Sequence, residues 1–568
     1  MTSGKVLHQG AAVTLSCFAL AAAGGYEVPE PKPVWGAVEV TAIYFPGTPQ
    51  RSEWQIVEQA TPERKPLLGW FDEGDPVNVD WQIKWAVEHG ISSFCVDWYW
   101  NRGVQRNDHW LKAYRRAKYR KCLSWYMLWC NHNEPGSHSV ADQTAMVKFW
   151  IDNYFRQDEY YKVDGKPAVV VWDVHNIDRD FRAEAAERGE TLAEGEGLKR
   201  AFALSERLVK EAGLPGIHWI MEFWEKGEIS KSRWERLKAA GFRELMNYSY
   251  DSCAIKTHPE YAKPGDTDMR FSYDCVVKAV RHFWNDVNID PELPFAPYIP
   301  TGWDVRPRWF QWGRVCYGRT PELFGEACRA ARRFCEERGV RRVILGPISE
   351  WQEGSYIEPN AEYGFAMYDA LRDAFCEKPA EGWPANVGPS DLGLKLREYP
   401  PLEQVAKPEW DFSKGFGGWY RNPYGAQQLT LVDGNLRLVT RGEHAMRVRP
   451  QPFAAADYRT VRLSMRLKAN PRSKFQPKGN EVVRLWFGTK DAPLLKLGGI
   501  CDLSKCLTAP VRVDGEWHEY EMRTDGDRTD GVPAWRGTVE ELWLEPTSLP
   551  DVFVDIASIR FDRHGDLL

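Results

Sequence analysis

The hydrophobic positions between residues 38 and 377 follow two alternating patterns. Short apolar runs rich in β-branched and aromatic residues are separated by stretches in which apolar residues recur every three or four positions. Runs that are apolar at nearly every position are typical of strands buried on both faces. Eight such runs occur, at 38–45, 91–100, 122–129, 167–172, 217–223, 243–249, 294–300 and 341–349.

The stretches between these runs carry helix signals. One helical face is formed before the second run by Val79, Ile83, Ala86 and Val87, and Gly90 is expected to end that helix. Similar patterns predict helices between Pro321 and Gly339 and over 365–375. Eight strand–helix units predict an α/β fold, a (β/α)8 TIM barrel, over residues 26–377. A doubly wound open sheet is the alternative, but the first strand ends in "YFPGTPQ", which has no glycine-rich phosphate turn.

A different pattern begins after residue 377. Residues 378–409 contain six prolines, which predicts a linker that wraps or spaces rather than folding independently. From residue 410 to 568 short runs alternate apolar and polar positions, at 428–440, 460–469, 482–489, 517–524 and 553–561. Period-2 strands joined by turn residues predict an all-β sandwich of the jelly-roll type.

The first 25 residues have the features of a secretory signal peptide. "MTSGKVLHQ" carries Lys5, and the short apolar stretch that follows ends with Ala21 and Ala23 in an A-x-A-like arrangement. This predicts export to the periplasm or outside the cell, with a mature chain starting near Gly24. The stretch is too short to span a bilayer, and no later stretch is long and apolar enough, so no membrane span is expected.

Composition narrows the classes of partner. With a net charge of −6 and a pI near 6.1, the chain has no overall basic field to hold nucleic acid. The basic run "KAYRRAKYRK" (112–121) is interpreted as the solvated face of a helix. The 27 Trp residues are many for 568 residues, and indole rings pack well against sugar rings. The alternative, that a large barrel buries many aromatic side chains, stays open.

Cysteine and histidine spacing indicates neither a metal site nor a redox motif. The 12 Cys residues occur almost singly, without C-x-x-C pairs or histidines at zinc spacing, and most are expected to be buried apolar side chains. His132 and His175 are interpreted as structural or sugar-contacting residues, because no other ligand set accompanies them.

Candidate chemistry lies at the strand ends, because TIM barrels build their active sites at the carboxyl ends of the strands. Glu350 follows the eighth run, and Glu353 comes three residues later in "SEWQEGSYIEPN" (349–360). Two carboxylates flanking one bond are what glycoside hydrolysis needs, whereas a solvated surface turn is the alternative for any such pair. The expected sugar contacts at other strand ends are Tyr44, Asp97, Trp98, Trp100, Asn131, Trp303, Asp304 and Tyr356.

Four blocks carry a resemblance to a known family. They are "AIYFP" (42–46), "WAVEHGISSFCVDWYW" (85–100), "PYIPTGWDVRPR" (297–308) and "ISEWQEGSYIEPNAEYGFAMYDALRDAF" (348–375). In this order they resemble the glycoside hydrolase family 99-like proteins, a group that includes WbsX-type domains. The resemblance implies a retaining α-glycosidase in which Glu350 is the general base and Glu353 the general acid, with no metal or organic cofactor. Gln352 stands where the family usually has histidine, which leaves the sugar open.

The resemblance also implies a particular stereochemistry. The base takes the proton of the sugar's own 2-hydroxyl, which then closes on the anomeric carbon, so this hydroxyl must lie trans to the leaving group. α-Mannosides and α-L-rhamnosides meet that condition, and a polysaccharide or oligosaccharide is the expected partner.

The second domain resembles jelly-roll carbohydrate-binding modules. "WDF" (410–412) opens it and "FVDIASIRFD" (553–562) closes it. Such modules often hold a structural calcium ion near their terminal strands, which makes Asp411 and Asp555 the candidate ligands. The alternative is that the domain only packs on the barrel.

Three functional classes follow from these features. The first is a secreted glycoside hydrolase. The second is a WbsX-type glycosyltransferase of polysaccharide biosynthesis, against which the export signal argues because nucleotide-sugar donors are cytosolic. The third is a non-catalytic glycan-binding protein, against which the intact acid pair argues. The sequence indicates no oligomeric state.

Overall fold

The computed structural model describes residues 26–223, 231–248, 254–287, 290–309, 313–401, 403–422, 426–441, 445–471, 473–494, 506–524 and 535–565. The predicted signal peptide, residues 1–25, lies outside these ranges. Within them no helix combines the length and the apolar character needed to cross a membrane.

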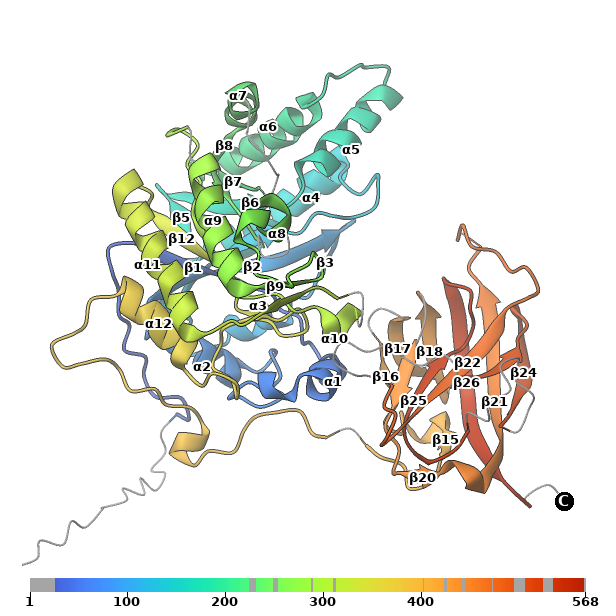
Figure 1. Cartoon of the computed structure of the whole chain (residues 1–568). Helices are drawn as coiled ribbons and strands as arrows, with labels where there is room; N and C mark the ends of the chain where they lie inside the picture. Colours follow the sequence, from blue (N-terminus) through green and yellow to red (C-terminus); the bar gives the residue numbers. More distant parts are fainter. Residues whose placement is uncertain are drawn as a thin grey trace, which may run out of the picture.

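Eight parallel strands form a barrel in the first part of the chain (Figure 1). They are β1 (Glu39–Tyr44), β2 (Ile91–Asn101), β4 (Ser124–Trp129), β6 (Lys166–Val171), β7 (His218–Glu222), β8 (Phe242–Met246), β10 (Tyr298–Ile299) and β12 (Arg342–Pro347). Their order is β10-β12-β1-β2-β4-β6-β7-β8, and a parallel bridge between Leu245 and Phe295 joins the two ends of this order. All eight predicted strands and the TIM-barrel fold are confirmed.

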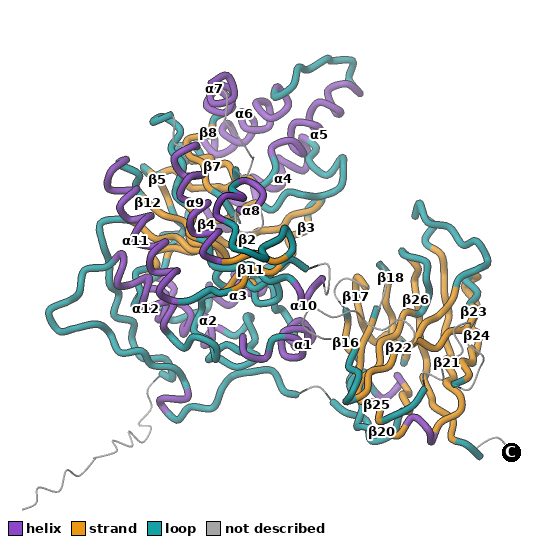
Figure 2. The backbone as a smooth tube through the Cα atoms, viewed as in Figure 1, coloured by secondary structure: helices purple, strands orange, loops and turns teal. Residues whose placement is uncertain are grey.

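Helices surround the barrel (Figure 2). They are α1 (Arg51–Ala60), α2 (Pro76–Val87), α3 (His109–Tyr114), α4 (Val140–Trp150), α5 (Val174–Glu187), α6 (Glu196–Glu211), α7 (Lys231–Ala240), α8 (Ala254–Thr257), α9 (Tyr273–Val287), α10 (Arg306–Trp309), α11 (Pro321–Arg338) and α12 (Ala366–Phe375). The predicted boundaries of α11 are confirmed. Thr320 caps its first turn, Pro321 occupies the first position, and Gly339 ends it with a φ of +66°.

Short strands lie in the loops between these elements. They are β3 (Val104–Arg106), β5 (Lys162–Val163), β9 (Arg270–Ser272), β11 (Val315–Tyr317), β13 (Ser349–Glu350) and β14 (Ser355–Tyr356). β13 and β14 pair with each other antiparallel directly after the eighth barrel strand, and this hairpin carries the acid pair.

The proline-rich segment lies along the barrel beside α2. Trp85 Nε1 donates to the Val387 carbonyl oxygen at 2.9 Å, and Asn78 Nδ2 donates to the Arg397 carbonyl oxygen at 3.0 Å. Arg397 also pairs with Asp75, the N-cap of α2, at 2.6 Å. The segment therefore follows the barrel surface before the second domain begins.

Two antiparallel sheets form the second domain, as predicted. The first sheet contains β15 (Glu409–Asp411), β17 (Ala426–Val432), β18 (Asn435–Thr440), β21 (Tyr458–Ala469), β24 (Asp514–Arg523) and β26 (Val552–Arg563). The second contains β16 (Tyr420–Arg421), β19 (Met446–Val448), β20 (Phe453–Ala454), β22 (Val482–Thr489), β23 (Cys506–Pro510) and β25 (Thr538–Glu545). The chain crosses between the sheets repeatedly, as in a jelly roll.

The second sheet packs against the barrel. On β22 and β25, Leu485 and Leu544 belong to the core of the sandwich, whereas their neighbours Trp486 and Trp543 belong to the apolar cluster of the barrel. This alternation follows from the period of two along a strand, which gives each face its own set of side chains. Figure 1 shows β16 and β25 on the side of the sandwich that faces the barrel.

Candidate active site

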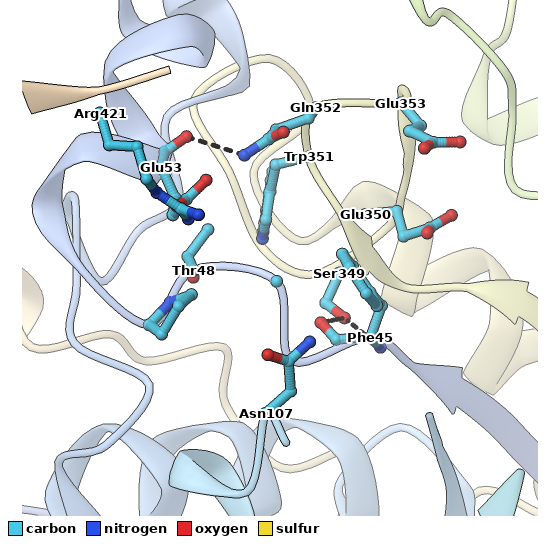
Figure 3. Close-up of a pocket in the computed structure, with 12 residues that line it drawn as sticks. Phe45, Thr48, Glu53, Asn107, Ser349, Glu350, Trp351, Gln352, Glu353 and Arg421 are labelled. Carbon is cyan, nitrogen blue, oxygen red and sulfur yellow. Dashed lines mark hydrogen bonds and ion pairs between the residues drawn. The ribbon is translucent and has the colours of Figure 1, made fainter. Parts of the chain in front are cut away.

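The β13–β14 hairpin places two carboxylates on one side of a tight turn. Glu350 ends β13 and is 7% exposed, and Glu353 lies half-buried in the turn, where its backbone N–H donates to the Glu350 carbonyl oxygen at 3.1 Å. Figure 3 shows the two carboxyl groups pointing to the same side of the hairpin. Gly354 makes the turn possible, because its φ is +73° and a Cβ there would lie 2.5 Å from the Asp304 nitrogen.

Bonds from three other segments fix this hairpin. Phe45 directly follows β1. Ser349 Oγ accepts a hydrogen bond from the Phe45 N–H and donates one to the Phe45 carbonyl oxygen, both at 3.0 Å. Arg64 donates to the Trp351 carbonyl oxygen at 2.9 Å, and the Asp304 N–H donates to the Glu353 carbonyl oxygen at 2.6 Å. The acid pair therefore sits on a rigid scaffold at the carboxyl ends of the strands.

Asp97 of β2 points into the mouth of the barrel. Its Oδ2 accepts a hydrogen bond of 3.1 Å from the Tyr248 hydroxyl, although β2 and β8 are not neighbours in the barrel, so the two side chains meet inside it. Burial, and next the negative charge of Glu350, raise the pKa of Asp97 well above its usual value. Two acids from different strands thus share one buried environment.

Aromatic side chains line the same mouth. Tyr99 contacts His132 at 6.0 Å between ring centroids, His132 contacts Trp172 at 5.6 Å, and Trp172 contacts Tyr248 at 4.9 Å. These residues lie at the carboxyl ends of β2, β4, β6 and β8, and the first three of these strands are neighbours in the barrel. Rings around a polar centre can pack against the apolar faces of a sugar.

A third buried acid, Glu222, ends β7. Its Oε1 accepts a hydrogen bond of 3.4 Å from the Tyr248 N–H. Burial is the main cause that raises the pKa of Glu222 well above its usual value.

Two predicted sugar contacts on β2 face away from the mouth. Trp98 and Trp100 stack on each other at 5.7 Å, and their indole nitrogens donate to the Tyr154 hydroxyl at 3.3 Å and to Asp142 at 3.2 Å. Because side chains alternate along a strand, Asp97 and Tyr99 take the inner face and the two indoles pack under α4. The alternation along β2 is visible in the sequence. It indicates that Tyr99, rather than Trp98 or Trp100, is the aromatic side chain in the mouth.

Tyr44 and Asn131 also have other partners. The Tyr44 hydroxyl donates to Glu73 at 3.1 Å and accepts from Gln82 of α2 at 3.0 Å, so Tyr44 lies between β1 and the helix layer. The Asn131 amide accepts from the Asp173 N–H at 2.7 Å and donates to the Asp173 carbonyl oxygen at 2.6 Å. Asn131 thereby ties the ends of β4 and β6 together.

The remaining predicted contacts support the loops around the site. The Tyr356 ring stacks on Trp351 at 5.0 Å, with the Arg319 guanidinium 4.3 Å from its centre. Asp304 pairs with Arg64 at 2.6 Å and with Arg306 at 2.7 Å. Burial alone would raise the pKa of Asp304, but the bonds and charges of the two arginines lower it. Trp303, half-buried, packs against the apolar cluster of the barrel.

A pocket opens beside the acid pair, between the barrel and the sandwich (Figure 3). Its wall includes Thr48 after β1, Glu53 of α1, Glu350, Trp351, Glu353 and Arg421 of β16. Arg421 pairs with Glu53 at 2.6 Å, so an ion pair that joins the two domains lines the pocket that holds both candidate catalytic acids.

The candidate calcium ligands have other partners. Asp555 pairs with Arg437 and with Arg466, each at 2.6 Å, which occupies its carboxylate with positive charge. Asp411 accepts from the Ser413 N–H at 3.1 Å as the cap of a short helical turn. The described residues include no group of three or more His, Cys, Asp or Glu side chains placed for a metal ion.

The chain is similar to two curated bacterial proteins. Two strains of Xanthomonas campestris pv. campestris have an "Uncharacterized protein WxcX" that is 22% identical over 361 residues, which are 58% of this chain and 46% of that protein. The chain therefore spans about half the length of these curated relatives.

The solved structures that this chain resembles are less similar to it in sequence. A "Glycoside hydrolase-like protein" is 14% identical with a TM-score of 0.43, over 62% of this chain and 98% of that one. A family 99 endo-α-mannosidase from Bacteroides thetaiotaomicron is 14% identical with a TM-score of 0.38, over 59% of this chain and 96% of that one. A family 29 carbohydrate-binding module is 6% identical with a TM-score of 0.17, over 28% and 84%. TM-scores below 0.5 establish no shared function.

The family comparison covers most of the barrel. The family model described as "Glycosyltransferase WbsX" matches residues 52–371, a stretch that runs from α1 to the last helix of the barrel and includes the β13–β14 hairpin. The match covers more than half of the 568 residues. The chain belongs to the WbsX family.

Proposed function

We propose that this protein is a glycan-acting enzyme, a glycoside hydrolase that cleaves α-glycosidic bonds with Glu350 and Glu353. One observation carries the proposal. A single short hairpin at the carboxyl end of β12 presents both carboxylates to the same side, and Glu350 lies buried near Asp97 in the mouth of the barrel. Buried acids placed together at this end of a TIM barrel are suited to acid–base chemistry.

The division of roles follows the resemblance and fits the exposure of the two acids. Glu350 removes the proton of the sugar's 2-hydroxyl, and that oxygen attacks the anomeric carbon. The bond to the leaving group breaks as Glu353 protonates the departing glycosidic oxygen. Water then opens the resulting 1,2-anhydro ring with the roles reversed, so the product retains its configuration. The partly exposed Glu353 is the better placed of the two to exchange protons with solvent.

This chemistry selects the substrate by stereochemistry. Ring closure needs a 2-hydroxyl trans to the leaving group, which α-mannosides and α-L-rhamnosides provide. The rings of Tyr99, Trp172 and Tyr248 supply apolar surface in the mouth against which a sugar can pack.

A transferase is the second candidate, and the description of the WbsX family model favours it. The two activities differ in the donor, because a transferase uses an activated nucleotide sugar whereas a hydrolase attacks a finished glycan. Incubation with UDP-, GDP- and dTDP-sugars together with a glycan acceptor tests for transfer. Hydrolysis of glycans without any nucleotide sugar supports the first candidate.

The decisive test of function is a screen with matched variants. The full chain is incubated with plant, algal and microbial polysaccharides, including mannans and rhamnose-containing glycans, and the released sugars are analysed. The hydrolase proposal predicts products with the wild type and with Glu381→Gln, an exposed control, and none with Glu350→Gln. Binding of a polysaccharide with no product from any member of the panel would instead favour a glycan-binding protein.

We propose that the protein acts outside the cytoplasm, on the basis of the signal features of residues 1–25. Amino-terminal sequencing of material from the periplasm and the medium should find a chain starting near Gly24. An intact Met1 on active cytoplasmic protein would contradict this location and would strengthen the transferase candidate.

A further inference from the structure

Two buried polar atoms in the pocket lack a hydrogen-bond partner among the described residues. They are Thr48 Oγ1, on a residue that is 2% exposed, and Trp351 Nε1, on a residue that is 1% exposed. Both residues line the pocket beside Glu350 and Glu353, and Figure 3 shows the nitrogen of Trp351 directed into the same space as Thr48. A buried polar group without a hydrogen-bond partner is unfavourable, so a ligand that supplies the partner gains affinity.

The chemistry of these atoms defines what they bind. An indole N–H only donates, and a threonine hydroxyl donates or accepts. Their joint partner must therefore present oxygen acceptors together with hydroxyl donors, as a sugar ring does. The apolar faces of Phe45 and Trp351 in the same pocket match the apolar face of such a ring.

The pocket is held in shape before any ligand binds. The Thr48 N–H donates to the buried Glu73 carboxylate at 2.7 Å, which fixes the loop after β1. Gln352 Nε2 donates to the Glu53 carbonyl oxygen at 2.9 Å, which ties the hairpin to α1. Preorganised donors lower the cost of ordering on binding.

The sandwich supplies the far wall. Arg421 of β16 lines the pocket and is held by the ion pair with Glu53, which is buried in α1. Next to it, Tyr420 accepts a hydrogen bond of 3.3 Å from Gln59 of α1. The second domain is thus fixed to α1 at the edge of the acid site.

We propose that this pocket is a sugar-binding subsite that the sandwich completes, and that it holds the glycan unit next to the one at the acid pair through Thr48 and Trp351. The inference rests on the proposed function. It gives the second domain a part in substrate recognition within the active site itself. Arg421 is a wall of the subsite and positions Glu53.

The test is binding of simple glycosides to the full chain by saturation-transfer NMR. The probes are methyl α-D-mannopyranoside, methyl α-L-rhamnopyranoside and methyl β-D-glucopyranoside. Thr48→Val removes the hydroxyl and keeps the volume of the side chain almost unchanged, and Trp351→Phe removes the indole N–H and keeps an aromatic ring. Thr430→Val, on the first sheet of the sandwich, is the matched control.

At least one probe should bind the wild type and the control equally. Each pocket variant should bind it roughly 3- to 10-fold more weakly, the loss expected for one hydrogen bond. Unchanged affinity in both pocket variants, or no binding of any probe to the wild type, would overturn the inference. Thermal unfolding of each variant separates lost binding from lost folding.

Failure of this inference can be told apart from failure of the proposed function. Glu350→Gln and Glu353→Gln should keep probe binding in the subsite while losing cleavage of natural glycans. If the KM for polysaccharide cleavage is the same in Thr48→Val, Trp351→Phe and the wild type, the subsite proposal is wrong and the hydrolase proposal stands. Probe binding without cleavage of any glycan would contradict the hydrolase.

Discussion

Asp97 of β2 lies close enough to Glu350 of the β13–β14 hairpin for the charge of Glu350 to add to the effect of burial and raise the Asp97 pKa. A raised pKa favours the protonated, neutral form of a carboxyl group. Protonation of Asp97 limits the negative charge beside the proposed base Glu350.

Asp97→Asn should accordingly preserve most of the activity, because asparagine is a neutral substitute of the same shape. In the wild type, kcat/KM should fall as the pH rises through the raised Asp97 pKa, since a second negative charge then appears beside Glu350. The asparagine variant should lack this alkaline loss. The measurement is kcat/KM against pH for both proteins.

A fall in kcat/KM of more than about 100-fold in Asp97→Asn, measured at the pH optimum of the variant, would contradict this role. It would mean that the charged form or the proton of Asp97 is needed. Asp97→Ala is the matched variant. It removes the acceptor of the Tyr248 hydroxyl and should be the more damaging of the two.

Glu358 predicts a pH dependence of stability. It is buried near Glu73 and accepts a hydrogen bond of 2.9 Å from Gln82, and burial followed by the Glu73 charge raises its pKa to about 8. An unfolded glutamate has a pKa of about 4.3, so the folded state binds the proton more tightly. The stability from this proton is complete below about pH 4.3 and is lost as the pH rises to about 8.

Glu358→Gln should remove this loss because glutamine is neutral at every pH. The free energy of unfolding of the variant, relative to wild type, should increase between pH 5 and 8 by at most about 1.4 kcal/mol per pH unit. Urea unfolding at several pH values measures it. A difference that stays constant with pH, as expected for the exposed control Glu381→Gln, would contradict a protonated Glu358.

The Arg421–Glu53 pair predicts that the two domains depend on each other. Arg421→Ala should lower the free energy of unfolding by about 1–3 kcal/mol, because it removes the partner of the buried Glu53 carboxylate. The double variant Arg421→Ala with Glu53→Gln should recover part of this loss. Thermal and urea unfolding report both values.

The control for this pair is Arg332→Ala, which breaks the exposed ion pair with Glu336 and should cost less than about 1 kcal/mol. A chain ending at residue 400 should melt below the full chain, since it also exposes the apolar barrel surface that Trp486 and Trp543 cover. Equal stability of Arg421→Ala and the wild type would show that the interface is held by other contacts.

The eight barrel strands could be predicted from the sequence because most of their side chains are buried, so each appears as a largely apolar run. The place of the acid pair could be predicted because it directly follows the last of these runs. The direction of the aromatic side chains at the end of β2 depends on the strand rather than on their chemistry. Trp98 and Trp100 have the chemistry of sugar contacts, but the period of two turns Asp97 and Tyr99 inward and the indoles outward.

The pocket wall could not be predicted from the sequence. Arg421 follows a proline-rich segment and belongs to a different domain from Glu53, so their contact depends on how two folded surfaces dock. The same holds for Asp555, whose carboxylate pairs with Arg437 and Arg466 on the two neighbouring strands. Pairings of this kind are set by tertiary packing and leave no local pattern.

The comparison of Glu350→Gln with Glu353→Gln on two kinds of glycoside tests the central claim most directly. Glu353→Gln should lower cleavage of natural glycosides by at least about 100-fold, because their leaving groups need protonation, but should largely spare glycosides with activated aryl leaving groups. Glu350→Gln should abolish cleavage of both, because ring closure by the 2-hydroxyl is needed whatever departs. A loss below about tenfold in both variants, with folding unchanged, would contradict the assignment of the acid pair to the β13–β14 hairpin.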